Sequence, residues 1–326
     1  MTISSVSILR SVLLVALTAF MADARAQAYP HKPIRWVIAY AAGGAADITA
    51  RIIAPRMSEF LGQQIVVDNR PGGAAIPGFD IVAKAPPDGY TWLIANIAFG
   101  ANPSLFRKLP FDVEKDFAEV SQLAIVPMVL VVHPSVPARS ARELIALAKA
   151  RPGALNYASA GNGGANHLAT EVFRSITGVD IVHVPYKTIG QALSDLIGGQ
   201  VSVLFATITS VHPYLKSGRL IALCISSLKR NAALPDLAPC SERGVAGYNV
   251  NEWQVLVVPA GTPSMVIERL HKEVVKVLAE PEIKDRLASL GAESVGSNPK
   301  EATEFVKSEL ARWAKIIKQA GIQPID

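Results

Sequence analysis

The chain has 326 residues, of which 50% are hydrophobic, and its 32 lysines and arginines outnumber its 27 aspartates and glutamates. The basic residues are scattered along the chain, whereas a nucleic-acid surface gathers them, usually with aromatic residues between. The composition therefore argues against a nucleic-acid partner, and the length allows two domains.

The first 26 residues have the pattern of a secretory signal peptide. Arg10 precedes an apolar run over residues 12–21, which is shorter than the ~20 residues that span a bilayer. The A-x-A sequence at residues 24–26 predicts cleavage before Gln27. We therefore expect a soluble periplasmic protein of 300 residues with 30 basic and 26 acidic side chains. A short membrane anchor is the alternative.

Strands and helices are expected to alternate at the start of the mature chain. Their predicted order is strand 33–40, glycine loop 41–47, helix 48–61, strand 63–70, glycine loop 71–78, helix 79–85 and strand 91–96. Apolar residues recur at helical spacing in the helices, whereas the strands are short apolar runs bounded by glycine or proline. This alternation is typical of an α/β fold with a largely parallel sheet.

Two long extended runs, residues 120–134 and 249–263, flank a second α/β unit. That unit is expected to contain helix 140–153, strand 155–159, glycine loop 160–166, helix 167–177, strand 180–186, helix 190–199, and strands 200–206 and 220–226. Two helices should follow the second run, at residues 263–280 and 298–321, and Asn298 should cap the latter.

The economical arrangement is two lobes joined by the two extended runs. Residues 27–130 and 257–326 would form the first lobe, and residues 131–256 the second. Ligand pockets favour the cleft between such units. We therefore expect a ligand cleft between the lobes.

The glycine loops at residues 41–47 and 160–166 each join a strand to a helix. Such a loop exposes backbone N–H groups, and the helix after it points its positive end at the same place. Two loops that face each other across a cleft would hold one carboxylate from both sides. A tight turn without ligand is the alternative for either loop alone, because neither has the G-x-G-x-x-G spacing.

Four side chains near these loops have more than one interpretation. Asp47 is expected to be the N-cap of its helix. His167, in the first turn of its helix, should bond to backbone and orient the loop. Ser159 could donate to an anion or cap a loop N–H, and Tyr40 could belong to the core or to the wall of the cleft.

No pattern in the sequence indicates catalysis or a metal. Ser159 and His167 lack an acidic third member placed by sequence, and there is no G-x-S-x-G motif. The six histidines lack metal-ligand spacing. We expect no enzyme activity, no metal and no cofactor. Cys224 and Cys240 are compatible with a disulfide or with free thiols, because spacing alone does not establish geometry.

Several segments occur in the order that one family of binding proteins has. They are "AAGGAAD", "VVDNRPGGAAIPG", "PPDGYTW", "YASAGNGGANHLATEVF", "HVPYK", "DLIGGQV" and "WQVLVVPAGTP". From about residue 29 to 322 the chain resembles the periplasmic substrate-binding proteins of tripartite tricarboxylate transporters, the TctC-like or Bug family. No single motif is specific, but their order is.

The resemblance implies a two-lobed type II periplasmic-binding-protein fold that closes over a small organic carboxylate, such as a di- or tricarboxylate or an aromatic acid. It also implies membrane transporter subunits as partners, and we expect a monomer. Alternatives are a binding protein that reports its ligand to a membrane sensor, and a hydrolase that uses Ser159. Carried over residue by residue, the expected ligand-binding positions are Tyr40, Ala42, Gly43, Gly44, Asp47, Asn96, Ser159, Gly161, Asn162, Gly163, His167 and Ala206.

The chain departs from the family pattern at four positions. Many relatives have glycine at the positions of Thr188 and Val255, and threonine at that of Cys240. Relatives often have an aspartate where this chain has Ala206. If that aspartate holds an amino group, Ala206 argues against an amino-acid ligand.

Overall fold

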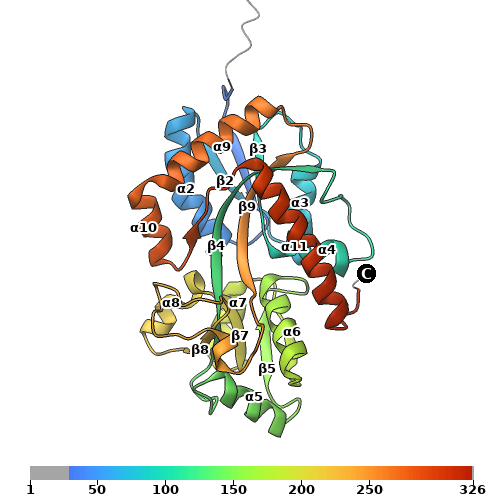
Figure 1. The fold of residues 1–326 in the computed structure, drawn as a ribbon, viewed down its shortest axis with the longest axis vertical. Helices are drawn as coiled ribbons and strands as arrows, with labels where there is room; N and C mark the ends of the chain where they lie inside the picture. The colour runs from blue at the N-terminus through green and yellow to red at the C-terminus, as the bar shows by residue number, and fades with distance from the viewer. Residues whose placement is uncertain (1–28, 325–326) are drawn as a thin grey trace, which may run out of the picture.

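The computed structural model describes residues 29–324, so the predicted signal peptide lies outside the described residues. Figure 1 shows two lobes, each built around a sheet with helices on its faces, and two long strands that pass through the middle of the molecule. Within residues 29–324, no helix has both the length and the apolar character needed to cross a membrane.

The sheet of the first lobe mixes parallel and antiparallel pairs. Its strands follow the spatial order β2, β1, β3, β9, β4, and β10 also pairs with β4. Strand β1 is parallel to β2 and β3, whereas β9 is antiparallel to β3 and β4. The bounds are β1 Ile34–Ile38, β2 Ile65–Asn69, β3 Thr91–Ala95, β4 Phe117–Val132, β9 Asn251–Pro259 and β10 Glu293–Ser294.

The sheet of the second lobe begins where that of the first ends. Strand β4 pairs with β9 as far as Pro127, and from Met128 onward it pairs with β7 and then with β8 as well. Strand β5 lies parallel between β7 and β6. The bounds are β5 Asn156–Ser159, β6 Val182–Pro185, β7 Val203–Thr207 and β8 Ile221–Ile225. Strand β4 therefore belongs to both sheets.

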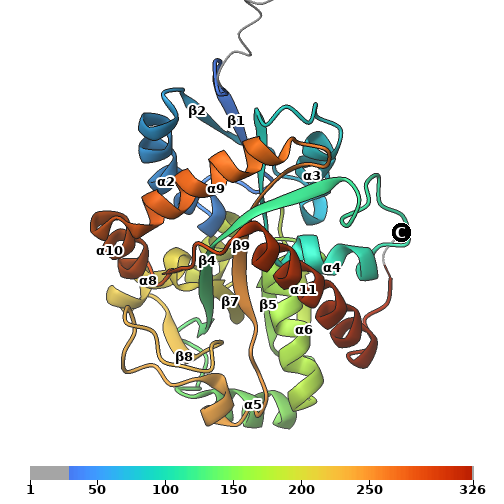
Figure 2. The same ribbon diagram turned by 45° about the horizontal axis from the view of Figure 1, so that its top comes forward.

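Helices from distant parts of the chain cover the two sheets. In Figures 1 and 2 the C-terminal helices α9 and α11 lie on the first lobe, as the sequence predicts. That lobe holds α2 Ala45–Leu61, α3 Ile76–Ala83, α4 Ile97–Leu105, α9 Ser264–Ala279, α10 Pro281–Ser289, α11 Pro299–Gln319 and the 3-10 turn η1 Gly73–Ala75. The second holds α5 Ala141–Ala150, α6 Ala165–Thr177, α7 Ile189–Ile197, α8 Ile208–Lys216 and the 3-10 turn η2 Cys240–Arg243.

Core packing follows the alternation of side chains along the strands. Ile34, Trp36 and Ile38 of β1 belong to one buried cluster with α2 and α9, and Val37 belongs to the cluster on the opposite face, with α4 and α11. Successive strand residues point to opposite faces of a sheet. A sheet covered on both faces needs apolar residues at both sets of positions, which explains the consecutive apolar residues Trp36, Val37 and Ile38 of β1.

The predicted lobe boundaries fall inside β4 and β9, the two crossing strands. In β4 the change of partner comes between Pro127 and Met128. The proposed division into residues 27–130 with 257–326, and 131–256, remains a prediction. The predicted cap of the last helix is confirmed, since Asn298 and Glu301 form a capping box at the start of α11.

A disulfide joins Cys224 of β8 to Cys240 of η2, which resolves the alternative that the sequence left open. Both residues are fully buried. The bridge ties β8, at the edge of the second sheet, to the loop that returns toward β9.

We predict that replacing both cysteines by alanine will lower the free energy of unfolding. The bridge closes a loop with a sequence separation of 16 residues, and loops of this length correspond to about 3 kcal/mol in the chain-entropy treatment. Urea unfolding of both proteins with and without a thiol reductant provides the measurement. The double variant should not respond to the reductant, and equal unfolding midpoints without reductant would contradict the prediction.

Candidate functional site

A cavity lies between the lobes, where β4 passes from one sheet to the other. Its walls come from segments 39–46 and 71–75 of the first lobe, and from segments 160–166, 187–189 and 207–210 of the second. Asn96, Met128 and Glu252 complete the lining. The volume open to the centre of a water molecule is about 90 Å³. The cavity fits a small molecule.

Among the residues that the structure describes, six helices begin at this cavity, three from each lobe. Each helix N-terminus carries roughly half a positive charge, and the N–H groups of its first turn point outward along the axis. The N-cap residues that line the cavity are Gly44 of α2, Ala75 of α3, Asn96 of α4, Gly164 of α6, Thr188 of α7 and Thr207 of α8. The cavity is therefore an environment that favours negative charge.

Most of these six helix starts lack a side-chain cap. The side chains of Asn96 and Thr188 accept from backbone N–H groups of their own helices. The N-caps of α2, α3, α6 and α8 make no such bond. The first-turn N–H groups of α2, α6 and α8 are therefore not committed to a capping side chain, which suits the binding of an anion. The start of α3 offers less, because the Ile76 N–H donates to the Gly73 carbonyl and Pro77 has no N–H.

Two residues of the cavity wall adopt a backbone conformation that is rare outside glycine. Ala74 and Ala75 have φ angles of 51° and 65°, and such residues in the left-handed region cost of order 1 kcal/mol or more each. The side chain of Asn102 in α4 donates to the carbonyl of Ala74 at 2.8 Å and holds this turn. Both alanines line the cavity, so its wall is shaped by a constrained turn.

The loop after β1 is held by Asp47, but not as the sequence predicts. The N-cap of α2 is Gly44, and Asp47 lies in the first turn of the helix. Its Oδ2 accepts from the Gly43 N–H at 2.9 Å, and its Oδ1 accepts from Arg51 and from Asn69. Burial opposes ionisation, but these three donors lower the pKa of Asp47 overall. The ionised Asp47 carboxylate therefore holds the loop in place through its hydrogen bonds.

The loop after β5 is held by histidines and a serine. The prediction that His167 bonds to backbone is confirmed, since its Nδ1 accepts from the Gly163 N–H at 3.3 Å. The Ser159 hydroxyl accepts from the Gly161 N–H at 3.1 Å and lies 2.7 Å from Nε2 of His183. Burial lowers the pKa of His183 to about 4, so its imidazole is neutral near pH 7. Ser159 is fully buried and does not line the cavity.

The expected ligand-binding residues separate into two groups. Three of them line the cavity: Tyr40, Gly44 and Asn96. The others of the two loops are not part of the lining: Ala42, Gly43, Asp47, Ser159, Gly161, Asn162, Gly163 and His167. A Cβ on Gly163 would lie 3.2 Å from Cβ of Ala74, so this glycine permits close contact between the lobes. Within the second group, Asp47, Ser159 and His167 hold the two loops through hydrogen bonds to backbone N–H groups.

Ala206 lies in the core of the second lobe and not in the cavity. It is fully buried in a cluster with Val129 and Leu204. The next residue, Thr207, lines the cavity, as expected from the alternation of a strand. The structure therefore gives no support to an argument against amino-acid ligands that depends on Ala206.

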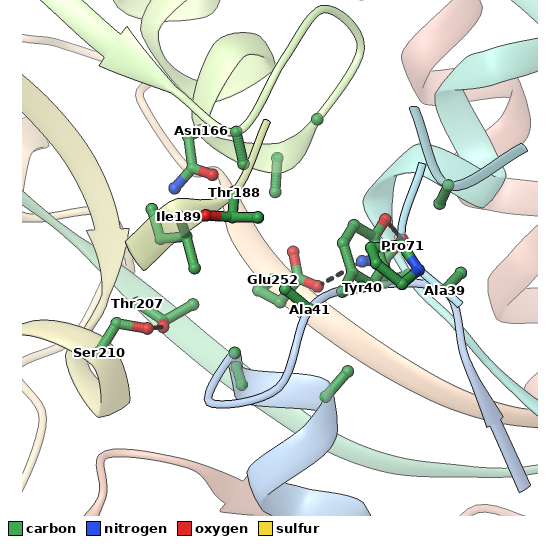
Figure 3. Close-up of a pocket in the computed structure, with 18 of the residues that line it drawn as sticks. Ala39, Tyr40, Ala41, Pro71, Asn166, Thr188, Ile189, Thr207, Ser210 and Glu252 are labelled. Carbon is green, nitrogen blue, oxygen red and sulfur yellow. Dashed lines mark hydrogen bonds between the residues drawn. The ribbon is translucent and has the colours of Figure 1, made fainter. Parts of the chain in front are cut away.

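Glu252 of β9 also lines the cavity, although the sequence does not predict it as a site residue. Figure 3 shows it close to Tyr40 and Ala41, with Thr188 on the other side. Its Oε1 accepts from the Asn96 amide at 2.7 Å, and the Tyr40 hydroxyl donates to the Asn96 oxygen at 2.7 Å. Burial raises the pKa of Glu252 to about 7, against the smaller effect of Asn96. A lone acidic residue inside the apolar run 249–263 was the signal that could have revealed it.

The neighbour of Glu252 fixes its orientation. Adjacent strand residues point to opposite sides, and Trp253 contacts α11 through an indole N–H that donates to Glu309 at 2.8 Å. Trp313 donates to the same Glu309 oxygen at 3.1 Å. This buried anchor holds β9 against α11 and leaves Glu252 on the cavity side.

A two-lobed α/β protein with an anion-favouring cavity between its lobes has the architecture of a type II periplasmic solute-binding protein. The chain matches the family model described as "Tripartite tricarboxylate transporter family receptor" over residues 49–322. It belongs to that family, and the resemblance and the fold class inferred from the sequence are confirmed.

Three solved structures of similar chains accompany this match. Rpa4515 of R. palustris, solved with adipate, is 36% identical with a TM-score of 0.88, over 91% of this chain and 100% of that one. The periplasmic binding protein BugD is 33% identical with a TM-score of 0.87, over 91% and 100%. MatC of Rhodopseudomonas palustris, with bound malate, is 29% identical with a TM-score of 0.83, over 89% and 100%.

We predict that Glu252→Gln will change the pH dependence of stability. The folded-state pKa of Glu252 is raised from 4.5 to about 7, so its contribution is fully present below pH 4.5 and is lost as the pH rises through 7. The wild type should lose about 3 kcal/mol relative to the variant by about pH 8. Urea unfolding across this pH range measures the difference, and parallel curves for both proteins would contradict it.

Proposed function

We propose that this protein captures a small organic carboxylate in the cavity between its lobes and delivers it to a tripartite tricarboxylate-type membrane transporter. The observation that carries the proposal is the convergence of six helix N-termini, three from each lobe, on one cavity. Such ends favour a carboxylate through their N–H groups and their partial positive charge. A ligand contacted from both lobes also stabilises the closed arrangement of the lobes.

The size and lining of the cavity support a compact acid. Two charged side chains line it, the exposed Lys187 and the buried Glu252, and much of the remaining surface is alanine, glycine and proline. Two similar proteins were solved with adipate and malate. We therefore propose a di- or tricarboxylate or a small aromatic acid as ligand. Lys187, at the opening, is placed to meet a second carboxylate.

The protein is proposed to release its ligand chemically unchanged. The hydrolase alternative needs a Ser159 hydroxyl that can reach a substrate, and this residue is buried outside the cavity lining. We propose a periplasmic monomer that works with transporter subunits and without a cofactor. Loss of carboxylate uptake in a deletion strain would support transport, whereas normal uptake with loss of a ligand response would favour the signalling alternative.

We predict that carboxylic acids will raise the melting temperature and that their neutral amides will not. Binding to the folded state alone stabilises it by about 2.7 kcal/mol when the ligand is at one hundred times its Kd. A thermal-shift panel should contain adipate, malate, citrate and benzoate, each beside its amide. Equal shifts from the acids and the amides would refute the helix-terminus argument.

We predict that Gly44→Val will weaken carboxylate binding by about tenfold or more, because it places a side chain where the anion meets the start of α2. The fold should tolerate it, since φ at this position is −76° and the nearest atom to a new Cβ is the Ala41 carbonyl oxygen at 3.5 Å. Calorimetry with an acid from the panel measures the affinity.

Gly190→Val is the matched control for this substitution. Gly190 lies near the start of α7, outside the cavity lining, and a Cβ there would have 3.9 Å to its nearest neighbour. The control should bind like the wild type. Full affinity in a folded Gly44 variant would remove the start of α2 from the binding site.

A further inference from the structure

One oxygen of Glu252 is buried at the cavity without a partner. The residue is 5% exposed, and nothing among residues 29–324 hydrogen-bonds to its Oε2. The other oxygen, Oε1, accepts from Asn96. A buried carboxylate oxygen without a hydrogen bond is costly. Either the ligand donates to Oε2, or Oε2 carries a proton.

The surrounding groups fix which oxygen can carry that proton. Asn96 cannot turn its amide, because its oxygen accepts from the Tyr40 hydroxyl at 2.7 Å and from the Ala98 N–H at 3.2 Å. Its NH₂ group therefore faces Glu252 and makes Oε1 an acceptor. A proton on Glu252 must then reside on Oε2.

The titratable and charged groups around Glu252 do not neutralise it. Tyr40, from the end of β1, is committed to Asn96, and burial raises its pKa well above its usual value. Strand β4 contributes the apolar Met128 to the cavity, and the second lobe contributes the exposed Lys187. Among the described residues, burial and the Asn96 hydrogen bond are the causes that shift the pKa of Glu252, and no cation is among them.

The bound carboxylate and Glu252 are in opposite environments. Helix N-termini keep the ligand carboxylate ionised, whereas burial favours the neutral form of Glu252. Two carboxylates that share a site cannot easily both be ionised, and the pair then holds one proton. Since its pKa is about 7 before any anion arrives, Glu252 is the member of the pair that takes it.

We propose that Glu252 binds the ligand in its protonated form, with Oε2–H donating to an oxygen of the ligand, so that each carboxylate that binds to ionised Glu252 brings one proton from solvent. This inference rests on the proposed function. It adds a specificity-determining residue to the cavity, because an unprotonated acceptor on the ligand is preferred opposite Oε2. It also couples affinity to pH.

The competing arrangement pairs ionised Glu252 with a cation on the ligand. An amino acid could place its carboxylate at the helix N-termini and its ammonium group at Oε2. Such a ligand needs no proton from solvent. Proton uptake therefore discriminates between the two arrangements.

Calorimetry at about pH 6 and pH 8.5, in buffers of different ionisation enthalpy, measures the protons taken up when adipate or malate binds. The wild type should take up almost none at the lower pH and close to one at the higher. Its affinity should fall by about tenfold per pH unit above pH 7. Glutamate and aspartate serve as the ammonium-bearing probes.

Glu252→Gln is the decisive variant, because its amide keeps a donor toward the ligand but does not titrate. It should bind the same acids with an affinity that does not depend on pH, and with buffer-independent heats. Glu119→Gln is the matched control, since Glu119 lies in β4 outside this cavity and accepts from Thr303. It should behave like the wild type.

A measurement without ligand tests the same group. The difference infrared spectrum between pH 6 and pH 8.5 should contain the carboxylic C=O band of a titrating Glu252, and the glutamine variant should lose that band. Absence of the band from the wild type would overturn the inference.

The calorimetric outcomes separate the two proposals. Binding of dicarboxylates by the wild type without proton uptake, or equal uptake by Glu252→Gln, would overturn the inference and leave the proposed function intact. Binding of glutamate or aspartate alone, lost in Glu252→Gln, would establish the cation arrangement instead. Failure of every acid in the thermal-shift panel to bind would overturn the proposed function and this inference with it.

Discussion

The shared strand β4 is the constraint on which the rest of the structure depends. It pairs with β9 in the first sheet as far as Pro127, and with β7 and β8 in the second sheet from Met128. The register of this one strand therefore sets the position of both sheets. Met128, at the change of partners, lies in the wall of the cavity. The binding site occupies the place where one sheet becomes the other.

Each helix that begins at the cavity follows a strand that ends beside it. The six strands β1, β2, β3, β5, β6 and β7 all lead into segments whose helices begin at this cavity. Ligands in open α/β sheets bind at the carboxyl ends of the strands for the same reason. Asp47 braces the loop of the first lobe, and His167 and Ser159 brace that of the second. These braces keep the backbone N–H groups in place before a ligand arrives.

Glu252 is an acidic side chain in the lining of a cavity whose helix N-termini favour a bound anion. A buried acid in an anion-favouring cavity is costly if it ionises, and its strand is held firmly through Trp253 and Glu309. The side chain therefore cannot easily withdraw. Positive helix ends and one proton-carrying acid can together recognise a carboxylate more selectively than either alone, because the acid demands an acceptor opposite its proton.

The sequence by itself determined the alternation of strands and helices, the two crossing runs and the family. These follow from local periodicity, from glycine and capping positions, and from the order of motifs. Among the site residues that the family resemblance implied, Tyr40, Gly44 and Asn96 line the cavity. The sequence does not predict the helices α4, α8 and α10. Helices α4 and α8 are short and contain Pro103 and Pro213, which interrupt the helical pattern. Helix α10 follows α9 directly.

Only the tertiary structure decided which residues of each loop face the ligand. Ala206 and Thr207 are neighbours, yet one lies in the core and the other in the cavity, since strand residues alternate in direction. Glu252 is distant in sequence from both glycine loops and reaches them only because β9 crosses between the lobes. Local patterns describe strands, helices and turns, but the sides of a cavity meet through contacts between distant segments, whose geometry the order of residues does not contain.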